Sequence, residues 1–299
     1  MFSRVLRVQL STASTAAGAR PPSSVVVKLP LDGANGDAAR ASGAYRREAL
    51  AYTDVLPHSP IRHPVAHLVH LETDGGVSIV MEDLSSHRMS DQMDGMAAAD
   101  AVAVAIGLRR FHDAWTGAPA LDGLAVRRAT PSTFAPEALD NGLDVLRRRW
   151  AADLDEHIIT AFDTLVTRRA TLVDRFGAAP RPTLVHGDPR ADNLAFAPDG
   201  APVLFDWQQL AVQLGEADVA WLAATSLRVE DRRSIDRELV AAYGGGIDRY
   251  RLGLALPGLA VLLLAQREVA DDRTARFITT SLQRIGAALV DLDVAALGR

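Results

Sequence analysis

Three short apolar runs beyond the middle of the sequence flank three polar side chains suited to metal-assisted phosphoryl transfer. Asp188 and Asn193 lie between Leu184–Val185 and Leu194–Phe196, and Asp206 follows a third run, Val203–Phe205. In such a reaction, one carboxylate orients an acceptor hydroxyl and takes its proton, while an amide oxygen and a second carboxylate hold Mg²⁺ on the nucleotide phosphates. The spacing therefore predicts Asp188 as catalytic base, and Asn193 and Asp206 as ligands of Mg²⁺.

The elements that must position these residues begin with a region of predicted sheet. Residues 5–10 and 25–29 are β-branched runs separated by turn-forming residues, which favours a hairpin. The alternative is an organelle transit peptide, because the first 31 residues contain basic side chains and no acidic ones. A predicted loop at 32–37 precedes a predicted helix at 40–55, and two further strands are expected at 63–71 and 77–81.

Beyond residue 82 the pattern becomes helical. Helical spacing covers 97–115, 136–149 and 155–176, a β-rich insert spans 183–208, and helical patterns then continue to the end. The predicted fold class is therefore α+β, with two lobes. We expect a small antiparallel-sheet lobe with one helix at 1–83 and a larger, mostly helical lobe at 84–299.

Composition excludes several classes of protein. The 299 residues include no cysteine, which excludes disulfides, thiolate metal sites and a cysteine nucleophile, and is typical of a reducing, cytoplasmic location. A net charge of −5 argues against a nucleic-acid partner. The most apolar stretch, 252–265, contains Pro257 and is shorter than the roughly 20 residues of a membrane span, so a buried helix is expected instead.

Seven segments resemble the aminoglycoside phosphotransferases and choline-kinase-like enzymes, which are relatives of the protein kinases. The segment His186-Gly187-Asp188-x-x-x-x-Asn193 is similar to the Brenner-type catalytic loop of these families, whose protein-kinase counterpart reads H-R-D-x-x-x-x-N. Asp206-Trp207-Gln208 stands where those enzymes carry the metal-binding aspartate. The residues of these motifs are most similar to those of the bacterial phosphotransferase enzyme family and the ecdysteroid-kinase-like branches. The remaining similar segments are 26–30, 45–52, 81–84, 111–115 and 215–220.

The resemblance implies a protein-kinase-like fold that uses ATP and Mg²⁺ to phosphorylate a small-molecule hydroxyl. It makes Lys28 the lysine that contacts the ATP phosphates and Glu48 the carboxylate that pairs with it. The hinge strand, with Glu82, Asp83 and Leu84, is implied to meet the adenine through its backbone.

Within the catalytic loop, the resemblance implies different roles for three neighbours. His186 is expected to brace the backbone, and Gly187 to allow a conformation that a Cβ would hinder. Arg190 lies two residues after Asp188, where Ser/Thr protein kinases place a lysine, so it is a candidate to neutralise charge on the transferred phosphoryl group. The alternative for Arg190 is a structural ion pair with Asp192 or Asp206.

The sequence departs from the family pattern near its start. No G-x-G-x-x-G loop is present in the sequence. The resemblance implies a further strand and a phosphate-covering loop before the strand that begins at about Arg4, so we expect either that the true start lies upstream of Met1 or that this segment is shortened. Two rival functions therefore stay open: a nucleotide-binding pseudokinase or regulatory module without turnover, and a purely structural or interaction protein. Sugars, amino alcohols and sterol-like molecules are expected acceptors ahead of aminoglycosides, and no oligomeric state is predicted.

Overall fold

The β-branched residues near the N-terminus form an antiparallel hairpin, as predicted. The computed structural model describes residues 3–11, 22–118, 121, 124, 126, 134–178 and 182–298. Strand β1 (Ser3–Gln9) pairs with β2 (Ser24–Pro30), with Val5 opposite Lys28. The register places Lys28 in the interior of β2 rather than in a turn, so its backbone is held by neighbouring strands.

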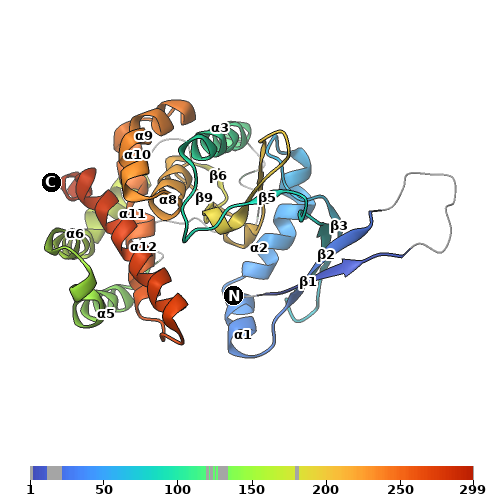
Figure 1. Ribbon diagram of the computed structural model, residues 1–299, viewed down its shortest axis with the longest axis horizontal. Coiled ribbons are helices and arrows are strands. Elements are labelled where there is room, and N and C mark those ends of the chain that lie inside the picture. The colour runs from blue at the N-terminus through green and yellow to red at the C-terminus, as the bar shows by residue number, and fades with distance from the viewer. Residues whose placement is uncertain are drawn as a thin grey trace. The chain divides into compact units, whose positions relative to one another are not determined.

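The hairpin belongs to a four-stranded antiparallel sheet with the order β1-β2-β4-β3 (Figure 1). The predicted strands at 63–71 and 77–81 are confirmed as β3 (Ala66–Leu71) and β4 (Val77–Glu82). Val77, Ile79 and Met81 alternate as buried residues along β4, which is the period-two pattern of a strand with one covered face. Helix α2 (Ala44–Leu50) packs against β3 and β4.

A second helix lies where the sequence predicts a loop. Residues 33–41 form helix α1 (Gly33–Ala41), so the expectation of one helix in this region is wrong in that detail. Contacts distant in sequence stabilise the short helix: Ala39 is fully buried, and Arg40 donates to the carbonyl of Leu31 and pairs with Asp74 at 3.0 Å. The predicted helix at 40–55 is represented by α2, a π turn (Ala51–Val55) and a 3₁₀ turn (Leu56–His58).

Packing divides the chain into two compact units. The first contains residues 1–89 and 195–210, and the second contains 90–194 and 211–299. In the first unit, β5 (Arg88–Met89), β7 (Leu194–Phe196) and β8 (Pro202–Leu204) form a small sheet, followed by a 3₁₀ turn (Trp207–Gln209). The division predicted from sequence at residue 83 stays a prediction.

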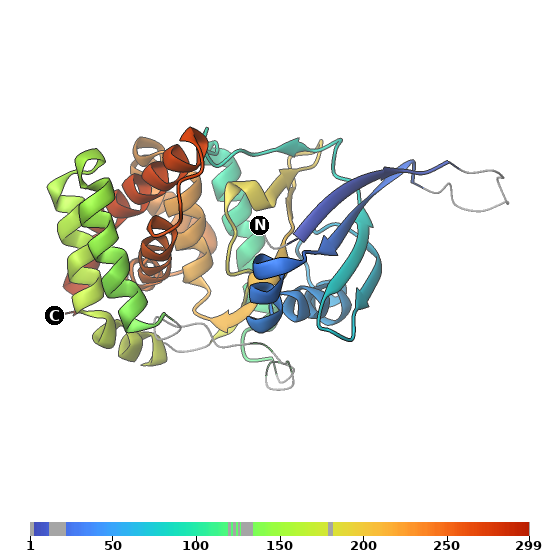
Figure 2. The ribbon, with the colours of Figure 1, turned by 90° about the horizontal axis from the view of Figure 1, so that it is seen from below.

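The second unit is mainly helical (Figures 1 and 2). Helices α8 (Glu216–Ser226) and α11 (Ala255–Ala265) are buried on nearly all sides, and α11 confirms the buried helix expected within 252–265. The predicted helices at 136–149 and 155–176 are present but interrupted, the first by a π turn (Leu146–Trp150) and the second at Arg168. None of the described helices is long and apolar enough to cross a membrane.

The remaining elements of the second unit are short strands and helices in chain order. Strand β6 pairs antiparallel with β9, which brackets the segment containing the candidate catalytic loop. The bounds are α3 (Ala98–Trp115), α5 (Pro136–Val145), a 3₁₀ turn (Ala151–Asp153), α6 (Glu156–Thr167), α7 (Arg169–Ala178), β6 (Thr183–Val185), a 3₁₀ turn (Ala191–Asn193), β9 (Ala211–Gln213), α8 (Glu216–Ser226), α9 (Val229–Tyr243), α10 (Ile247–Gly253), α11 (Ala255–Ala265), α12 (Asp272–Asp291) and a 3₁₀ turn (Val294–Gly298).

Candidate active site

In the first unit, one buried ammonium group joins two carboxylates from different elements. Lys28 on β2 places its Nζ 2.6 Å from Glu48 Oε1 on α2 and 2.6 Å from Asp206 Oδ1 after β8. Lys28 is the only lysine in the sequence. The structure thus brings together three of the residues that the sequence predicted for nucleotide and metal binding.

Burial and charge act in opposite directions on this cluster. Burial disfavours the charged form of Lys28, but the carboxylates of Glu48 and Asp206 outweigh it and raise the pKa of the lysine. Glu48 is fully buried, and this burial raises its pKa, with the charge of Lys28 offsetting only part of the effect. Two carboxylates thus stabilise the ammonium of Lys28, while burial disfavours the charged form of Glu48.

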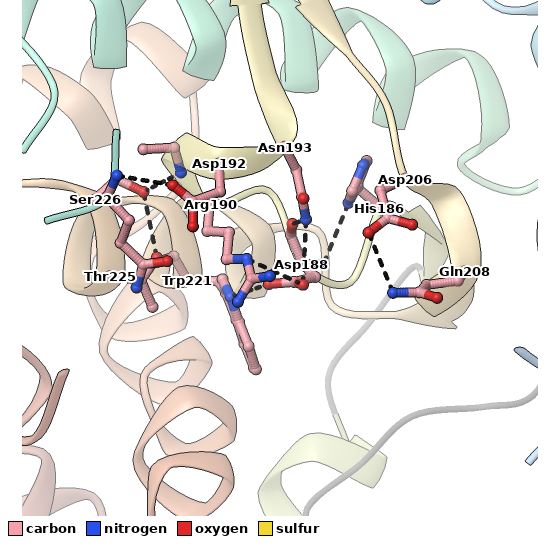
Figure 3. A network of polar contacts seen from close by, with 12 residues as sticks. His186, Asp188, Arg190, Asp192, Asn193, Asp206, Gln208, Trp221, Thr225 and Ser226 are labelled. Atoms are coloured by element: carbon pink, nitrogen blue, oxygen red, sulfur yellow. Dashed lines mark hydrogen bonds and ion pairs between the residues drawn. The ribbon is translucent and has the colours of Figure 1, made fainter. Parts of the chain in front are cut away.

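The backbone around Asp206 has an unusual conformation. Asp206 has φ +65°, in the left-handed region that aspartate tolerates better than most residues. Its Oδ2 accepts a hydrogen bond from Gln208 Nε2 at 3.2 Å, and the carbonyl of Gln208 accepts from Arg47 Nε at 2.9 Å (Figure 3). The carboxylate is therefore held on one side by Lys28 and on the other by its own turn.

In the second unit, the segment 186–193 is held by its backbone. Gly187 has φ +82°, which confirms the prediction that this position needs a residue without a Cβ. The N–H groups of His186 and Gly187 donate to the two carboxylate oxygens of Asp218 on α8, at 2.7 and 2.9 Å. His186 Nδ1 accepts from the N–H of Asp188 at 3.3 Å, in agreement with the bracing role expected for this histidine.

Three side chains surround the carboxylate of Asp188 (Figure 3). Trp221 Nε1 donates to Oδ1 at 2.9 Å, Asn193 Nδ2 donates to Oδ2 at 3.2 Å, and Arg190 Nε lies 3.6 Å from Oδ2. Arg190 thus lies beside Asp188, whereas Asp192 Oδ1 accepts from the N–H of Gln92 at 2.9 Å. Arg190 accordingly contributes positive charge beside the candidate base.

The orientation of Asn193 fits its predicted role toward a metal ion. Its amide nitrogen donates both to the carboxylate and to the carbonyl of Asp188, the latter at 2.8 Å. The amide nitrogen is thus committed to the loop, and the oxygen is the atom of Asn193 suited to bind a cation. An amide oxygen here and the Asp206 carboxylate in the first unit are both hard oxygen donors, the type that Mg²⁺ prefers.

A buried network behind the loop includes residues to which the sequence analysis assigned no role. His112 lies with Nδ1 2.8 Å from the hydroxyl of Tyr243 and Nε2 3.3 Å from Asp218 Oδ2. Burial raises the pKa of Tyr243, and the nearby charges of Glu216 and Asp218 add to this effect. A signal for Asp218 was present in the sequence, because an acidic side chain within an otherwise apolar helix must find a buried partner.

The predicted hinge residues hold the first unit together through their side chains. Glu82 Oε1 pairs with Arg62 at 2.8 Å, and Asp83 Oδ2 accepts from Ser24 and Arg7 at 2.5 and 2.6 Å. The hydrogen bond from Ser24 is the main reason that the pKa of Asp83 is lowered. The contact of Glu82, Asp83 and Leu84 with an adenine through their backbone stays a prediction.

Comparisons with solved structures show what this architecture is similar to. A choline/ethanolamine kinase family protein from Mesorhizobium loti is 18% identical, with 91% of this chain and 86% of that chain covered and a TM-score of 0.55. Spectinomycin phosphotransferase APH(9)-Ia, solved with ADP and spectinomycin, is 13% identical over 96% of this chain and 93% of that chain, with a TM-score of 0.57. Choline kinase LicA from Streptococcus pneumoniae is 16% identical over 94% and 93%, with a TM-score of 0.51. These likenesses confirm the predicted two-lobed, kinase-like α+β fold.

Sequence comparisons gave one match and one negative result. A comparison with curated proteins found none that matches this chain. The model of the phosphotransferase enzyme family, by contrast, matches residues 13–252, which include both the Lys28 cluster and the Asp188 loop. The chain therefore belongs to the phosphotransferase enzyme family.

Proposed function

We propose that this protein is an ATP-dependent kinase that transfers the γ-phosphoryl group to a hydroxyl of a small molecule. The observation that carries the proposal is the arrangement within each unit. Lys28 is clamped by Glu48 and Asp206 in the first, and Asp188 is held by Asn193 and the backbone-bound loop in the second. Both arrangements occur in a chain of the phosphotransferase family.

The proposed reaction assigns one task to each residue. Asp188 accepts the proton of the acceptor hydroxyl as the acceptor oxygen bonds to the γ-phosphorus. The bond from that phosphorus to the bridging oxygen breaks, and its electron pair leaves with ADP. Lys28 binds the phosphates of ATP. Mg²⁺, which Asn193 and Asp206 would hold, supplies neutralisation of phosphate charge.

Arg190 is proposed to stabilise the phosphoryl group during transfer. Its guanidinium lies beside the base, where charge develops, and a guanidinium forms strong charge-assisted hydrogen bonds to phosphoryl oxygens. Arg190→Ala should lower kcat by about a hundredfold with the KM for ATP retained. Unchanged kcat with reduced folding stability would assign Arg190 to structure alone.

The acceptor is proposed to be a small amino alcohol or a related hydroxylated metabolite in the cytoplasm. Solved relatives are described as choline or ethanolamine kinases and as a spectinomycin phosphotransferase, all of which take small molecules. The chain's net charge of −5 fits an amine-bearing acceptor better than a nucleic acid. Sugars, sterol-like alcohols and aminoglycosides form the rest of the test panel.

The single lysine makes nucleotide binding directly testable. An acyl-phosphate derivative of ATP should transfer its acyl group to Lys28, giving one side-chain adduct by mass spectrometry that excess Mg·ATP prevents. Labelling lost in Lys28→Arg would locate the adduct. A chain that is not labelled and does not bind Mg·ATP at millimolar concentration would be a structural or interaction protein instead.

Turnover separates a kinase from a pseudokinase. ADP release is measured with Mg·ATP and choline, ethanolamine, spectinomycin, kanamycin, sugars and hydroxylated lipids, with Asp188→Ala as the inactive control. Turnover that depends on Asp188 supports the proposal. Labelling of Lys28 without acceptor-dependent ADP release over the whole panel would favour a nucleotide-binding regulatory module.

A further inference from the structure

Helix α8 contacts the catalytic loop at several points along one face. Positions 218, 221 and 225 are three and four residues apart, so their side chains lie on the same side of the helix. Asp218 accepts from two backbone N–H groups of the loop, and Ser226, next to this row, accepts from the N–H of Ala191 at 2.9 Å. Between these anchors, Trp221 is the residue of α8 that reaches the Asp188 side chain itself (Figure 3).

The contact between Trp221 and Asp188 has the properties of a positioning contact. An indole N–H is a donor only, so it cannot compete with a carboxylate for a proton. Donation to a carboxylate is charge-assisted and stronger than a neutral hydrogen bond. The ring is partly buried on a helix whose other side chains are almost all buried, so the donor stands on a rigid element.

We propose that Trp221 is a positioning residue for phosphoryl transfer, whose indole N–H holds the Asp188 carboxylate in the orientation that meets the acceptor hydroxyl. This inference rests on the proposed function, in which Asp188 is the base. Trp221 fixes Oδ1 while Asn193 fixes Oδ2, so the plane of the carboxylate is determined from two different elements, α8 and the loop. Without Trp221, the carboxylate loses a contact that comes from outside its own loop.

The first experiment tests the contact in the protein without ligands. The sequence has four tryptophans, so a ¹H–¹⁵N spectrum contains four indole N–H signals, and Trp221→Phe identifies one of them. In Asp188→Ala, the Trp221 signal should move upfield and exchange faster with water, while the other three stay in place. A Trp221 signal unchanged in Asp188→Ala would overturn the inference, whatever the activity of the enzyme.

The second experiment separates the N–H from the bulk of the ring. Trp221→Phe keeps a ring without the donor and should lower kcat about tenfold to a hundredfold, with the KM for ATP unchanged. Trp221→Gln carries an amide N–H the same number of bonds from Cα and should recover part of this loss. Rates are measured as ADP release with Mg·ATP and the panel acceptor that gives most turnover.

A matched control comes from another buried indole. Trp150 donates to the carbonyl of Ala265 at 3.1 Å within the second unit, so Trp150→Phe removes an indole hydrogen bond to a neutral acceptor without touching the loop. Its kcat should equal that of the wild type. Equal loss in Trp221→Phe and Trp221→Gln, or wild-type kcat in Trp221→Phe beside an inactive Asp188→Ala, would overturn the inference alone. Full activity in Asp188→Ala would instead overturn the proposed function.

Discussion

At the scale of single residues, the Lys28 cluster shows how a functional group is kept charged inside a protein. Lys28 is 8% exposed and Glu48 is fully buried, so neither charge is stabilised well by water. Each is stabilised by the other, and one oxygen of Glu48, Oε2, has no hydrogen-bond partner in the described part of the chain. Removing only one of the two charged groups should therefore destabilise the fold.

Removing the lysine should destabilise the fold more than removing the pair. Lys28→Met leaves a buried carboxylate without its cation, which should lower the free energy of unfolding by about 3–5 kcal/mol. The double variant Lys28→Met with Glu48→Leu should recover part of this loss, because an apolar pair of similar volume avoids the buried charge. Urea unfolding at pH 7 measures both. Equal stability of the single and double variants would show that the two side chains are not energetically coupled.

At the scale of elements, α8 links the catalytic loop to the helices behind it. Asp218 accepts from the backbone of the loop and lies 3.3 Å from His112 of α3, which in turn contacts Tyr243 of α9. A buried carboxylate that serves two N–H groups and a histidine satisfies several polar atoms at once. The position of the loop therefore depends on three helices, not on its own sequence alone.

Asp218→Ala should affect both stability and activity through this link. Two backbone N–H groups, of His186 and Gly187, lose their acceptor, which should cost about 2–4 kcal/mol and lower the melting temperature. Ser226→Ala removes one acceptor from the same helix and should cost about half as much, so it serves as the graded comparison. Differential scanning calorimetry checks the order. A melting temperature equal to the wild type in Asp218→Ala would contradict the anchoring role.

An ion cluster joins α9 to α12 and should make stability depend on pH. Asp291 is bound by Arg232 and, at 2.7 Å, by Arg233 Nε. Burial acts to raise the pKa of Asp291, but the two guanidinium groups outweigh it and the pKa is lowered. Because the folded state holds this carboxylate ionised, its contribution is fully present above pH of about 4 and is lost as the pH falls through the lowered value.

Asp291→Asn tests this pH dependence. The variant should be less stable than the wild type by about 2 kcal/mol at pH 7, and the difference should shrink as the pH is lowered below about 4. Thermal melts between pH 3 and pH 7 measure it. A difference independent of pH would mean that the charge of Asp291 contributes nothing, and only its shape matters.

At the scale of the whole molecule, the chain passes between its two units more than once. It leaves the first unit after residue 89, returns for 195–210 and then completes the second unit. The proposed nucleotide and metal residues are consequently distributed over both units, with Lys28, Glu48 and Asp206 in one and Asp188 and Asn193 in the other. A nucleotide that binds the folded chain and not the unfolded one should stabilise the fold.

Mg·ATP should therefore raise the melting temperature. At a nucleotide concentration of about 100 times Kd, the stabilisation is about 2.7 kcal/mol. The shift should be reduced by EDTA and in Asp206→Asn, whereas Asp199→Asn, in a turn of the same unit, should retain it. Thermal denaturation followed by circular dichroism is the measurement. An equal shift in Asp206→Asn and the wild type would argue against a metal role for Asp206.

Residue types and spacing in the sequence were enough to predict a candidate site. The types and spacing of Asp188, Asn193 and Asp206 predicted a base and two metal ligands. Gly187 adopts the positive φ that was expected at its position. The β-branched runs predicted the hairpin carrying Lys28, because β-branched residues favour strands and turn-forming residues separate the two runs. The roles of these residues toward ATP and Mg²⁺ remain predictions.

The tertiary structure decided the features that depend on partners distant in sequence. Residues 33–41 form a helix despite their loop-like composition, because Arg40 bonds to Leu31 and pairs with Asp74. Trp221 contacts the carboxylate of Asp188, which lies 33 positions earlier in the sequence. Residue types and their spacing along the chain thus determined which candidate base and ligand groups are present. Only packing decided which side chains hold those groups in place, because hydrogen bonds and burial depend on distances in space that separation along the sequence does not specify.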